Sequence, residues 1–209
     1  MKAASAAPPL SHRERLLTEG LRHFYASGFH GTSVDELLAA AGAPKGSFYH
    51  HFGSKEAFAK AVLGEYSAQQ SRSLAEFAAR DDLSAYRKLL AYFDALVDRF
   101  AQSEHKVACL AGKFSTELAP NSDEFSGAIA ASMKNWRLAV TRLLAAGHRD
   151  GSIRRDMTPT QQGFLLQALV QGSLVVSLAD RSAESLSAIR GMLPKLLSAK
   201  HGPRPRADA

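Results

Sequence analysis

Cysteine is nearly absent from this sequence, which has one such residue, Cys109, among 209. A single cysteine excludes a disulfide within the chain and argues against a zinc site built from cysteine thiolates. Long apolar runs are also lacking. The most apolar stretch, residues 164–179, includes two glutamines and is shorter than the roughly 20 residues needed to cross a membrane. We expect it to form a helix that is buried on nearly all sides, and we expect no membrane partner.

The patterns of enzymes and metal sites are missing as well. The sequence has no glycine-rich phosphate loop, no nucleophile elbow and no obvious pair of carboxylates. His50 and His51 are adjacent, and two histidines on a helix face one metal ion when they are four residues apart. We therefore predict no enzymatic activity, no metal and no cofactor. The first residues lack the continuous apolar segment of a signal peptide, so a cytoplasmic location is expected.

The composition is typical of a soluble globular protein, with 45% apolar and 22% charged residues, and the length favours a small domain joined to a larger one. The formal charge of +6 favours polyanionic partners but does not identify a nucleic-acid-binding protein by itself. The first 60 residues carry seven basic against five acidic residues, so they hold little of this excess. Residues 1–10 and the basic residues 200–209 are expected to be flexible ends.

Helix starts are clearly marked in the first 60 residues. Ser11–Glu14 and Ser33–Glu36 have the spacing of a capping box, in which each side chain accepts a hydrogen bond from the other residue's backbone N–H. Gly28 and Gly42 are placed to end the two helices. A short third helix is expected to begin near Pro44, because proline is tolerated in a first helical turn.

The third helix has two chemically different sides. Phe48 and Phe52, four residues apart, are predicted to face inward, which leaves polar residues on the other side. Ser54 is expected to cap a long fourth helix that runs to about residue 80. Three short helices with a glycine-containing turn between the second and third are the layout of a helix-turn-helix unit. The alternative that these patterns allow is a small structural bundle with solvated polar residues.

Residues 28–58 resemble the DNA-binding signature of the tetracycline-repressor (TetR) family. The positions in register with that signature are Gly28, Phe29, Thr32, Ala41, Gly42, Lys45, Gly46, residues 48–52, Lys55 and Glu56. The sequence departs from the family pattern at Leu38, where a small residue is common, and at residues 43–44, where Val-Ser is common. These departures concern the choice of bases rather than the fold.

The resemblance implies that the third helix enters the major groove of double-stranded DNA. The residues implied to face the groove and its walls are Lys45, Gly46, Ser47, Tyr49 and His50. The positions that resemble the family's phosphate contacts are Thr32, Ser33 and Lys55. Helix N-termini present free N–H groups to anions, which agrees with this assignment. We expect Lys45 and Ser47 to contact bases, and Tyr49 and Lys55 mainly to position the protein on the DNA backbone.

No segment alternates with the period of a β-strand, so we predict an all-α fold with about nine helices. A helix-turn-helix domain is predicted at residues 11–54 and a larger helical domain at residues 55–199. The family resemblance implies that the larger domain has an internal ligand pocket. It also implies that the last two helices, about 159–179 and 183–198, pair with their copies in a homodimer that binds a palindromic operator. The residues expected at the dimer interface are Gln167, Gln171, Leu174 and Leu178.

Cys109 is predicted in the first turn of a short helix. The positive field of a helix N-terminus, with His105, Lys106 and Lys113 nearby in sequence, favours a thiolate there. The surrounding segment resembles TetR-family branches that sense electrophiles, oxidants or acrylate-like acids, and in the electrophile-sensing branch the matching cysteine is modified. The alternative is an inert side chain, since a lone free cysteine is most often a small buried hydrophobe.

The residues expected at the effector site are Cys109, Phe100, His105, Phe114, Met133, Trp136 and Phe164. We expect a repressor that an effector releases from its operator, through modification of Cys109. A second hypothesis keeps this fold but has a noncovalent hydrophobic effector in the same pocket. A third hypothesis, of another class, is a helical ligand-binding protein or an enzyme. Sequence-selective and salt-dependent retention of DNA would separate a regulator from both.

Overall fold

The computed structural model describes residues 10–104 and 106–199. The ends expected to be flexible, residues 1–10 and 200–209, lie outside this range except for residue 10. Within the described part, nine α-helices and one 3-10 turn, Ala119–Asn121, follow one another. The α-helices are α1 (His12–Ser27), α2 (Val34–Ala41), α3 (Lys45–Phe52), α4 (Lys55–Ala78), α5 (Ala85–Gln102), α6 (Leu110–Glu117), α7 (Asp123–Arg149), α8 (Pro159–Asp180) and α9 (Glu184–Leu197). The predictions of an all-α fold and of about nine helices are confirmed.

The first two helices begin at the predicted capping boxes. The Ser11 side chain accepts a hydrogen bond from the backbone N–H of Glu14, and the Glu14 carboxylate accepts one from the N–H of Ser11 at 2.8 Å. Ser33 and Glu36 form the same reciprocal pair at the start of α2. α2 ends at Gly42, whose φ of 55° is left-handed and carries no steric penalty for glycine. The tight turn that results lets α3 begin at Lys45.

Aromatic side chains hold the first three helices together and fix them to α4. Phe24, Phe48 and Phe58 are fully buried, and the ring centroids of Phe48 and Phe58 are 5.1 Å apart. Phe52 is also buried, so both phenylalanines of α3 face inward as predicted. This core extends past residue 54, because Phe114 of α6 packs on Phe24 with ring centroids 5.3 Å apart. The first three helices therefore share one core with the larger domain.

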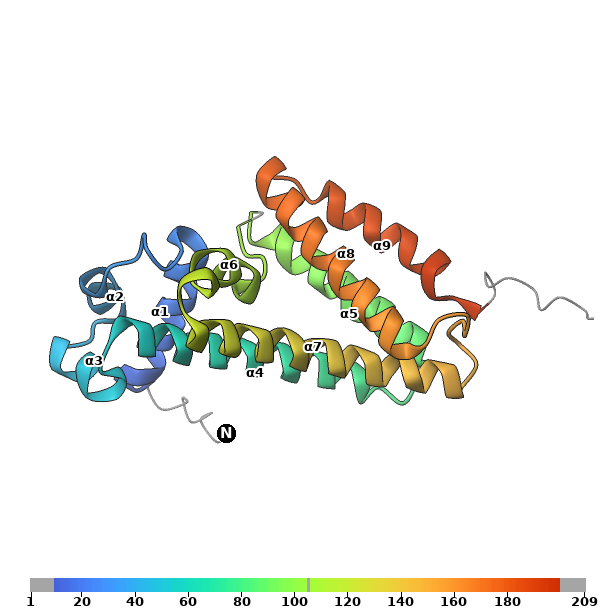
Figure 1. The fold of residues 1–209 in the computed structure, drawn as a ribbon, viewed down its shortest axis with the longest axis horizontal. Helices are drawn as coiled ribbons and strands as arrows, with labels where there is room; N and C mark the ends of the chain where they lie inside the picture. The colour runs from blue at the N-terminus through green and yellow to red at the C-terminus, as the bar shows by residue number, and fades with distance from the viewer. Residues whose placement is uncertain (1–9, 105, 200–209) are drawn as a thin grey trace, which may run out of the picture.

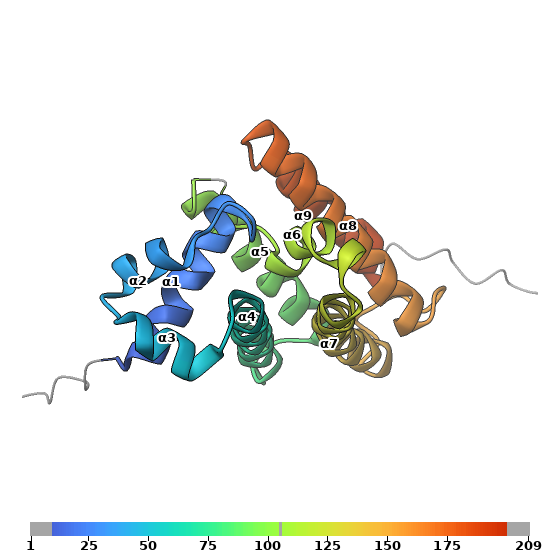
Figure 2. The ribbon, with the colours of Figure 1, turned by 60° about the vertical axis from the view of Figure 1, so that its left-hand side comes forward.

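The rest of the described chain is a helical bundle built on two long helices. α4 and α7 lie side by side along the length of the molecule (Figure 1, Figure 2). α5 packs against both long helices, α8 packs against α7, and α9 packs against α5 and α8. These helices surround a second core, which includes Leu89, Phe93, Leu144, Leu166 and Leu193. The short helix α6 contacts α1, α4 and α7. It therefore lies where the two parts of the molecule meet.

α8 has one buried side and one exposed side. It is long and apolar enough to cross a membrane by length and composition, but one side packs against α7 and α9. The exposed residues recur at intervals of three or four and form a surface that we call the α8 stripe: Phe164, Ala168, Gly172, Val175, Val176 and Ala179. Val175 is 67% exposed and Phe164 is 53% exposed. The expectation of a helix buried on nearly all sides is therefore wrong for the single chain.

Candidate functional site

The outer side of α3 carries most of the residues predicted to contact DNA. Lys45, Gly46, Tyr49 and His50 are exposed, and Ser47 is half-buried. A Cβ atom added at Gly46 would have no other atom within 4 Å, so this glycine faces open space. The helix therefore presents a polar surface on which Gly46 has no side chain. Its two phenylalanines are buried on the opposite side.

The turn between α2 and α3 is held by a residue that the sequence analysis missed. The Arg15 guanidinium, on α1, donates hydrogen bonds to the carbonyl oxygens of Ala41 at 2.8 Å and Gly42 at 3.2 Å. These carbonyls end α2 and have no partner within a helix of that length. Arg15 therefore fixes the position of α3 relative to α1. A lone arginine in an amphipathic helix gives no sequence signal of such a contact.

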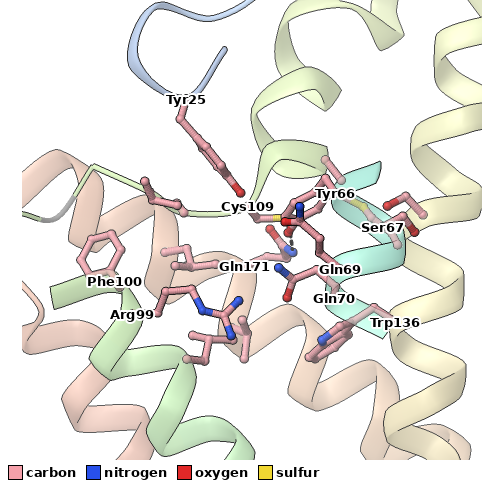
Figure 3. A pocket seen from close by; sticks show the side chains of 18 of the residues that line it. Tyr25, Tyr66, Ser67, Gln69, Gln70, Arg99, Phe100, Cys109, Trp136 and Gln171 are labelled. Atoms are coloured by element: carbon pink, nitrogen blue, oxygen red, sulfur yellow. Dashed lines mark hydrogen bonds between the residues drawn. The ribbon is translucent and has the colours of Figure 1, made fainter. Parts of the chain in front are cut away.

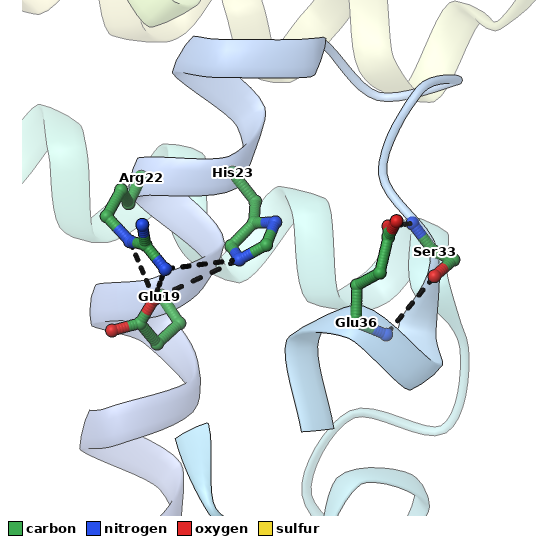
Figure 4. A network of polar contacts seen from close by, with 5 residues as sticks. All are labelled: Glu19, Arg22, His23, Ser33 and Glu36. Carbon is green, nitrogen blue, oxygen red and sulfur yellow. Dashed lines mark hydrogen bonds and ion pairs between the residues drawn. The ribbon is translucent and has the colours of Figure 1, made fainter. Parts of the chain in front are cut away.

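The two predicted phosphate-binding residues before α2 differ in their surroundings. Thr32 is buried, and its hydroxyl donates a hydrogen bond to the carbonyl oxygen of Gly28 at 2.7 Å. Its side chain stabilises the loop and does not face outward, so the phosphate contact predicted at this position would fall to the backbone. Ser33 is exposed and pairs with Glu36 in the capping box, as Figure 4 shows. Hydrogen bonds from Ser33 hold the pKa of Glu36 below its ordinary value, so a negative charge lies at this helix start.

A network of charged residues lies on α1 close to this helix start. The Arg22 guanidinium and the Glu19 carboxylate are 2.7 Å apart, and the His23 ring lies beside them (Figure 4). The carboxylates of Glu19 and Glu36 are thus engaged by groups within the domain. The carboxylate of Asp35, also at this helix start, lies beside Lys45 of α3.

The two lysines predicted to contact DNA are placed differently. Lys45 is exposed at the first position of α3, with its Nζ atom 3.8 Å from the Asp35 carboxylate. Lys55 is half-buried at the first position of α4, and its Nζ atom lies 4.4 Å from the centroid of the Phe29 ring. A cation over an aromatic face is held in place without losing its charge. Lys55 is therefore the better oriented of the two cations.

A cavity of about 240 Å³ lies between α4, α5, α6, α7 and α8 of the larger domain and the end of α1 (Figure 3). Four of the predicted effector residues line it: Phe100, Cys109, Met133 and Trp136. The other described residues of its wall include Tyr25, Tyr66, Ser67, Gln69, Gln70, Arg99, Gln167 and Gln171. The wall thus combines aromatic rings with amide and hydroxyl groups, which is the composition of a site for a small organic ligand.

Cys109 is half-buried at the edge of this cavity and caps α6. Its Sγ atom accepts hydrogen bonds from the Gly112 N–H at 3.3 Å, from the Tyr66 hydroxyl at 3.4 Å and from the Gln171 side-chain amide at 3.3 Å. Burial, and then the nearby sulfur, raise the pKa of Tyr66 well above its ordinary value, so its hydroxyl keeps its proton and remains a donor. Three donors thus converge on one sulfur atom and fix its position at the edge of the cavity.

Two predicted effector residues lie elsewhere, and one is not described. Phe114 is fully buried in the first core and does not line the cavity. Phe164 belongs to the α8 stripe, and the Arg137 guanidinium lies 4.1 Å from the centroid of its ring. Both positions are corrected, because each ring sits on the side of its helix that faces away from the cavity. His105 lies outside the described residues.

Three of the four residues predicted at a dimer interface point into their own chain. Gln167 bonds to the Met133 carbonyl oxygen and accepts from Arg137, and Gln171 bonds to Cys109. Leu174 is only 6% exposed and belongs to the second core. Leu178 remains 39% exposed. The correction follows from the near-uniform apolar character of α8, which hides from the sequence which side faces the core.

α6 is joined to the end of α1 by two side chains that the sequence analysis also missed. The Lys113 ammonium donates to the Tyr25 carbonyl oxygen at 2.8 Å, and the Glu117 carboxylate accepts from the Phe29 N–H at 2.6 Å. Lys113 and Glu117 are four residues apart and so lie on one side of the helix. Cys109 is four residues before Lys113. One short helix therefore connects the cavity with the domain that carries α3.

The described residues contain no group of three or more His, Cys, Asp or Glu side chains that could hold a metal ion. His50 and His51 are both exposed on α3. Their ring centroids are 5.3 Å apart, and the rings lie at 61° to each other.

Comparison with known proteins matches the chain in two parts. The sequence profile described as "Bacterial regulatory proteins, tetR family" matches residues 16–62, and the profile described as "Tetracyclin repressor-like, C-terminal domain" matches residues 85–193. The HTH-type transcriptional repressor DhaR of Mycobacterium sp. (strain GP1) is 33% identical over 83% of this chain and 86% of its own length. The HTH-type transcriptional repressor NemR of Escherichia coli (strain K12) is 32% identical over 83% of this chain and 87% of its own.

Solved structures give the same result for the fold. The reduced form of Escherichia coli NemR superposes with a TM-score of 0.83 at 30% sequence identity, over 90% of this chain and 97% of that one. The regulatory protein TetR from Rhodobacter sphaeroides superposes with a TM-score of 0.82 over 91% of this chain and 98% of that one, at 23% identity.

Proposed function

Because this chain belongs to the TetR family of bacterial regulatory proteins and is a DNA-binding transcriptional regulator, we propose that it is a cytoplasmic repressor. In this proposal a homodimer binds a palindromic operator and an effector releases it. The observation that carries the proposal is the two-sided character of α3. Buried phenylalanines fix one side, and the other exposes Lys45, Tyr49 and His50 around a glycine that faces open space.

The proposed DNA contacts follow from this surface. A helix that lies in the major groove brings its exposed N-terminal side chains to the base edges, so Lys45 and Ser47 are proposed to contact bases. Gly46 lets the helix backbone approach the DNA closely. Tyr49 and Lys55 are proposed to contact phosphates, and the Phe29 ring supports Lys55 in a fixed orientation for this role.

The α8 stripe is the proposed dimer surface. It exposes Phe164, Val175 and Val176 together with small apolar residues, and soluble monomers rarely leave a large apolar patch in water. A second copy of the chain is the proposed occupant, because a two-fold dimer places two α3 helices at a fixed spacing along DNA. Its small members, Ala168, Gly172 and Ala179, allow two α8 helices to approach closely. Met192 of α9, the other helix expected in the dimer, is 49% exposed.

The cavity is the proposed effector site, and modification of Cys109 is the proposed signal. An α,β-unsaturated carbonyl compound adds to a thiol without any further reactant. The sulfur bonds to the β-carbon, the carbon–carbon double bond becomes single, and the thiol proton ends on the α-carbon. The donors around Cys109 support this step, because they hold the sulfur atom at the edge of the cavity, where a bound electrophile can reach it.

α6 is the proposed route from the cavity to DNA. A substituted sulfur is larger and accepts hydrogen bonds less well, so the cap on the Gly112 N–H is lost. Any shift of α6 then acts on α1 through Lys113 and Glu117, which hold the Tyr25 carbonyl and the Phe29 N–H. Because both copies must dock together, a small change in the spacing of the two α3 helices weakens binding strongly.

The test uses DNA fragments that the protein selects from a random pool, with binding measured by fluorescence anisotropy. N-ethylmaleimide should weaken binding about tenfold or more at one equivalent per chain, and mass spectrometry counts the modification because Cys109 is the chain's single cysteine. Cys109→Ser should bind the same fragments and ignore the reagent. Absence of any sequence selectivity, or full affinity after complete modification, would overturn the proposal.

The noncovalent alternative is favoured by one observation, the aromatic and aliphatic part of the cavity wall around Phe100, Met133 and Trp136. N-ethylsuccinimide has nearly the same shape as N-ethylmaleimide but cannot react with a thiol. Release of both wild type and Cys109→Ser by the succinimide would support a noncovalent effector. Release by the maleimide alone, and of wild type alone, supports the covalent one.

A further inference from the structure

The wall of the cavity contains one charge and no counter-charge. Arg99 of α5 is the sole Arg, Lys, Asp or Glu among the described residues that line it. The other polar groups of the wall are amides, hydroxyls and the Cys109 thiol. No described carboxylate lies within ion-pair distance of Arg99; the hydrogen bond found for its guanidinium is to the Ser73 hydroxyl at 3.3 Å. The cavity therefore has a net positive charge that nothing in its wall offsets.

Helix geometry directs Arg99 toward this cavity. Leu96, Arg99 and Phe100 are three and four residues apart on α5, so they share one side of the helix, and all three line the cavity. Figure 3 shows the guanidinium in the same cavity as Cys109 and Gln171. Asp98 is next to Arg99 in sequence, but its carboxylate lies 3.6 Å from the guanidinium of Arg190 on α9. The nearest acid in the sequence is thus engaged elsewhere.

We propose that Arg99 makes this cavity selective for small organic anions, with a carboxylate or similar group on the guanidinium and an apolar body against Phe100 and Trp136. A guanidinium binds a carboxylate through two parallel hydrogen bonds and keeps its charge at any physiological pH. Arg99 is exposed at the cavity edge, where water already meets its head group, so an anion reaches it without crossing the apolar wall. The cavity lies below the roughly 300–1,000 Å³ of drug-sized sites, which restricts the anion to a small molecule.

The neutral groups of the wall complete the anion site. Gln70 and Gln171 can each turn an amide N–H toward a carboxylate, and both lie in the cavity with Arg99 in Figure 3. Burial raises the pKa of Tyr25, which lines the same cavity, so its hydroxyl also stays protonated and able to donate. The wall thus offers several donors and no fixed negative charge. This proposal rests on the proposed function only in taking the cavity as the effector site.

Two reagents of nearly equal size test the charge selectivity without DNA. Iodoacetate is an anion and iodoacetamide is neutral, and both transfer a carbon to the Cys109 sulfur with loss of iodide. Intact mass gives the rate at which each reagent alkylates Cys109, and the ratio of the iodoacetate rate to the iodoacetamide rate is divided by the same ratio for N-acetylcysteine. This normalised ratio should be about three to ten in the wild type. Arg99→Gln should return this value to about one, and Arg99→Lys should retain part of it. Arg87→Gln, an equal charge change at an exposed position of α5 outside the cavity, should leave it unchanged.

A normalised ratio near one in the wild type, or a raised ratio that survives Arg99→Gln, would overturn the proposal. Calorimetry with benzoate and benzamide gives a second measurement that needs no reaction at Cys109. Benzoate should bind more tightly than benzamide by a similar factor, and only when Arg99 is present; equal binding, or no binding of benzoate, refutes the charge selectivity. Failure of either measurement leaves DNA release by N-ethylmaleimide unaffected, so the two proposals fail separately.

Discussion

Gly28→Ala should destabilise the protein by breaking the link between α6 and the DNA-binding domain. Gly28 has φ 73° and ψ −176°, a region that is essentially restricted to glycine, so alanine is strained there by about 1–3 kcal/mol. Its Cβ atom would also overlap the carboxylate oxygens of Glu117. The carboxylate must then move away and give up its 2.6 Å hydrogen bond from the Phe29 N–H.

The loss of this hydrogen bond adds to the backbone strain. A hydrogen bond to a charged group contributes about 1.5–3 kcal/mol, so Gly28→Ala should lower the free energy of unfolding by about 2.5–6 kcal/mol in total. In a Glu117→Ala background the hydrogen bond is already gone and the space is open. There Gly28→Ala should cost only its backbone strain. The two substitutions should therefore be non-additive by about 1.5–3 kcal/mol.

Urea denaturation of the four proteins, followed by circular dichroism at one protein concentration, measures this coupling. Gly42→Ala is the matched control. Gly42 also has a positive φ, but a Cβ atom there would meet nothing within 4 Å, so its cost should be strain alone and independent of Glu117. Additive effects of Gly28→Ala and Glu117→Ala, or equal costs at Gly28 and Gly42 with no dependence on Glu117, would refute the reasoning.

Three further substitutions test other parts of the molecule. Lys55→Ala should weaken binding to selected and random DNA alike and reduce the slope of log affinity against log salt by about one, measured by anisotropy over a salt series. Val175→Asp should convert the proposed dimer to a monomer in sedimentation equilibrium, because it buries a charge in the α8 stripe. Asp150→Asn should flatten the dependence of unfolding free energy on acid pH. Burial acts to raise the pKa of Asp150, but hydrogen bonds from Ser152 and Ala85 outweigh it and leave the pKa below its ordinary value. Its contribution is thus present above the ordinary pKa near 4 and lost as the pH falls through the lower folded value, which urea denaturation between pH 6 and 2 would measure.

Each of these predictions has a result that would contradict it, and Val175→Asp also has a matched control. An unchanged salt slope in Lys55→Ala would remove this lysine from the proposed phosphate contacts. Leu138→Asp changes a 41% exposed leucine on α7, away from the α8 stripe, and should leave the proposed dimer intact. Equal dissociation by Leu138→Asp and Val175→Asp would show general destabilisation instead. An unaltered acid profile in Asp150→Asn would contradict the direction of the pKa shift.

Local signals in the sequence predicted the helix boundaries well, because capping depends on residues three or four apart. The boxes at Ser11 and Ser33 start α1 and α2 where the spacing places them, and Gly42 ends α2 with the expected left-handed backbone. The inward phenylalanines of α3 follow from the same local period. These features require no knowledge of the rest of the chain.

Contacts between distant segments could not be predicted from such short spacings in the sequence. Glu117 and Phe29 are 88 residues apart, and the acceptor pairs with a backbone N–H that has no residue-specific signal. Lys113 likewise bonds a backbone carbonyl. On α8, apolar residues occur on every side, so periodicity could not tell that Gln171 faces the cavity and Phe164 faces outward. Side-chain direction there depends on which helices pack against α8.

The two sides of α8 join the cavity and the proposed dimer surface in one rigid element. Gln171 bonds Cys109 on the inner side, while Val176, five residues further on and on another side of the helix, is 46% exposed in the α8 stripe. If two copies pair through this stripe, a ligand that displaces Gln171 acts on the helix that sets their relative position. Linkage requires the converse: DNA that fixes the spacing of the two copies must weaken the ligand by the same factor by which the ligand weakens DNA binding. Coupling through α8 would persist when both side-chain contacts of α6 are removed, so the residual effector response of the double variant Lys113→Ala and Glu117→Ala measures the share carried by the dimer surface.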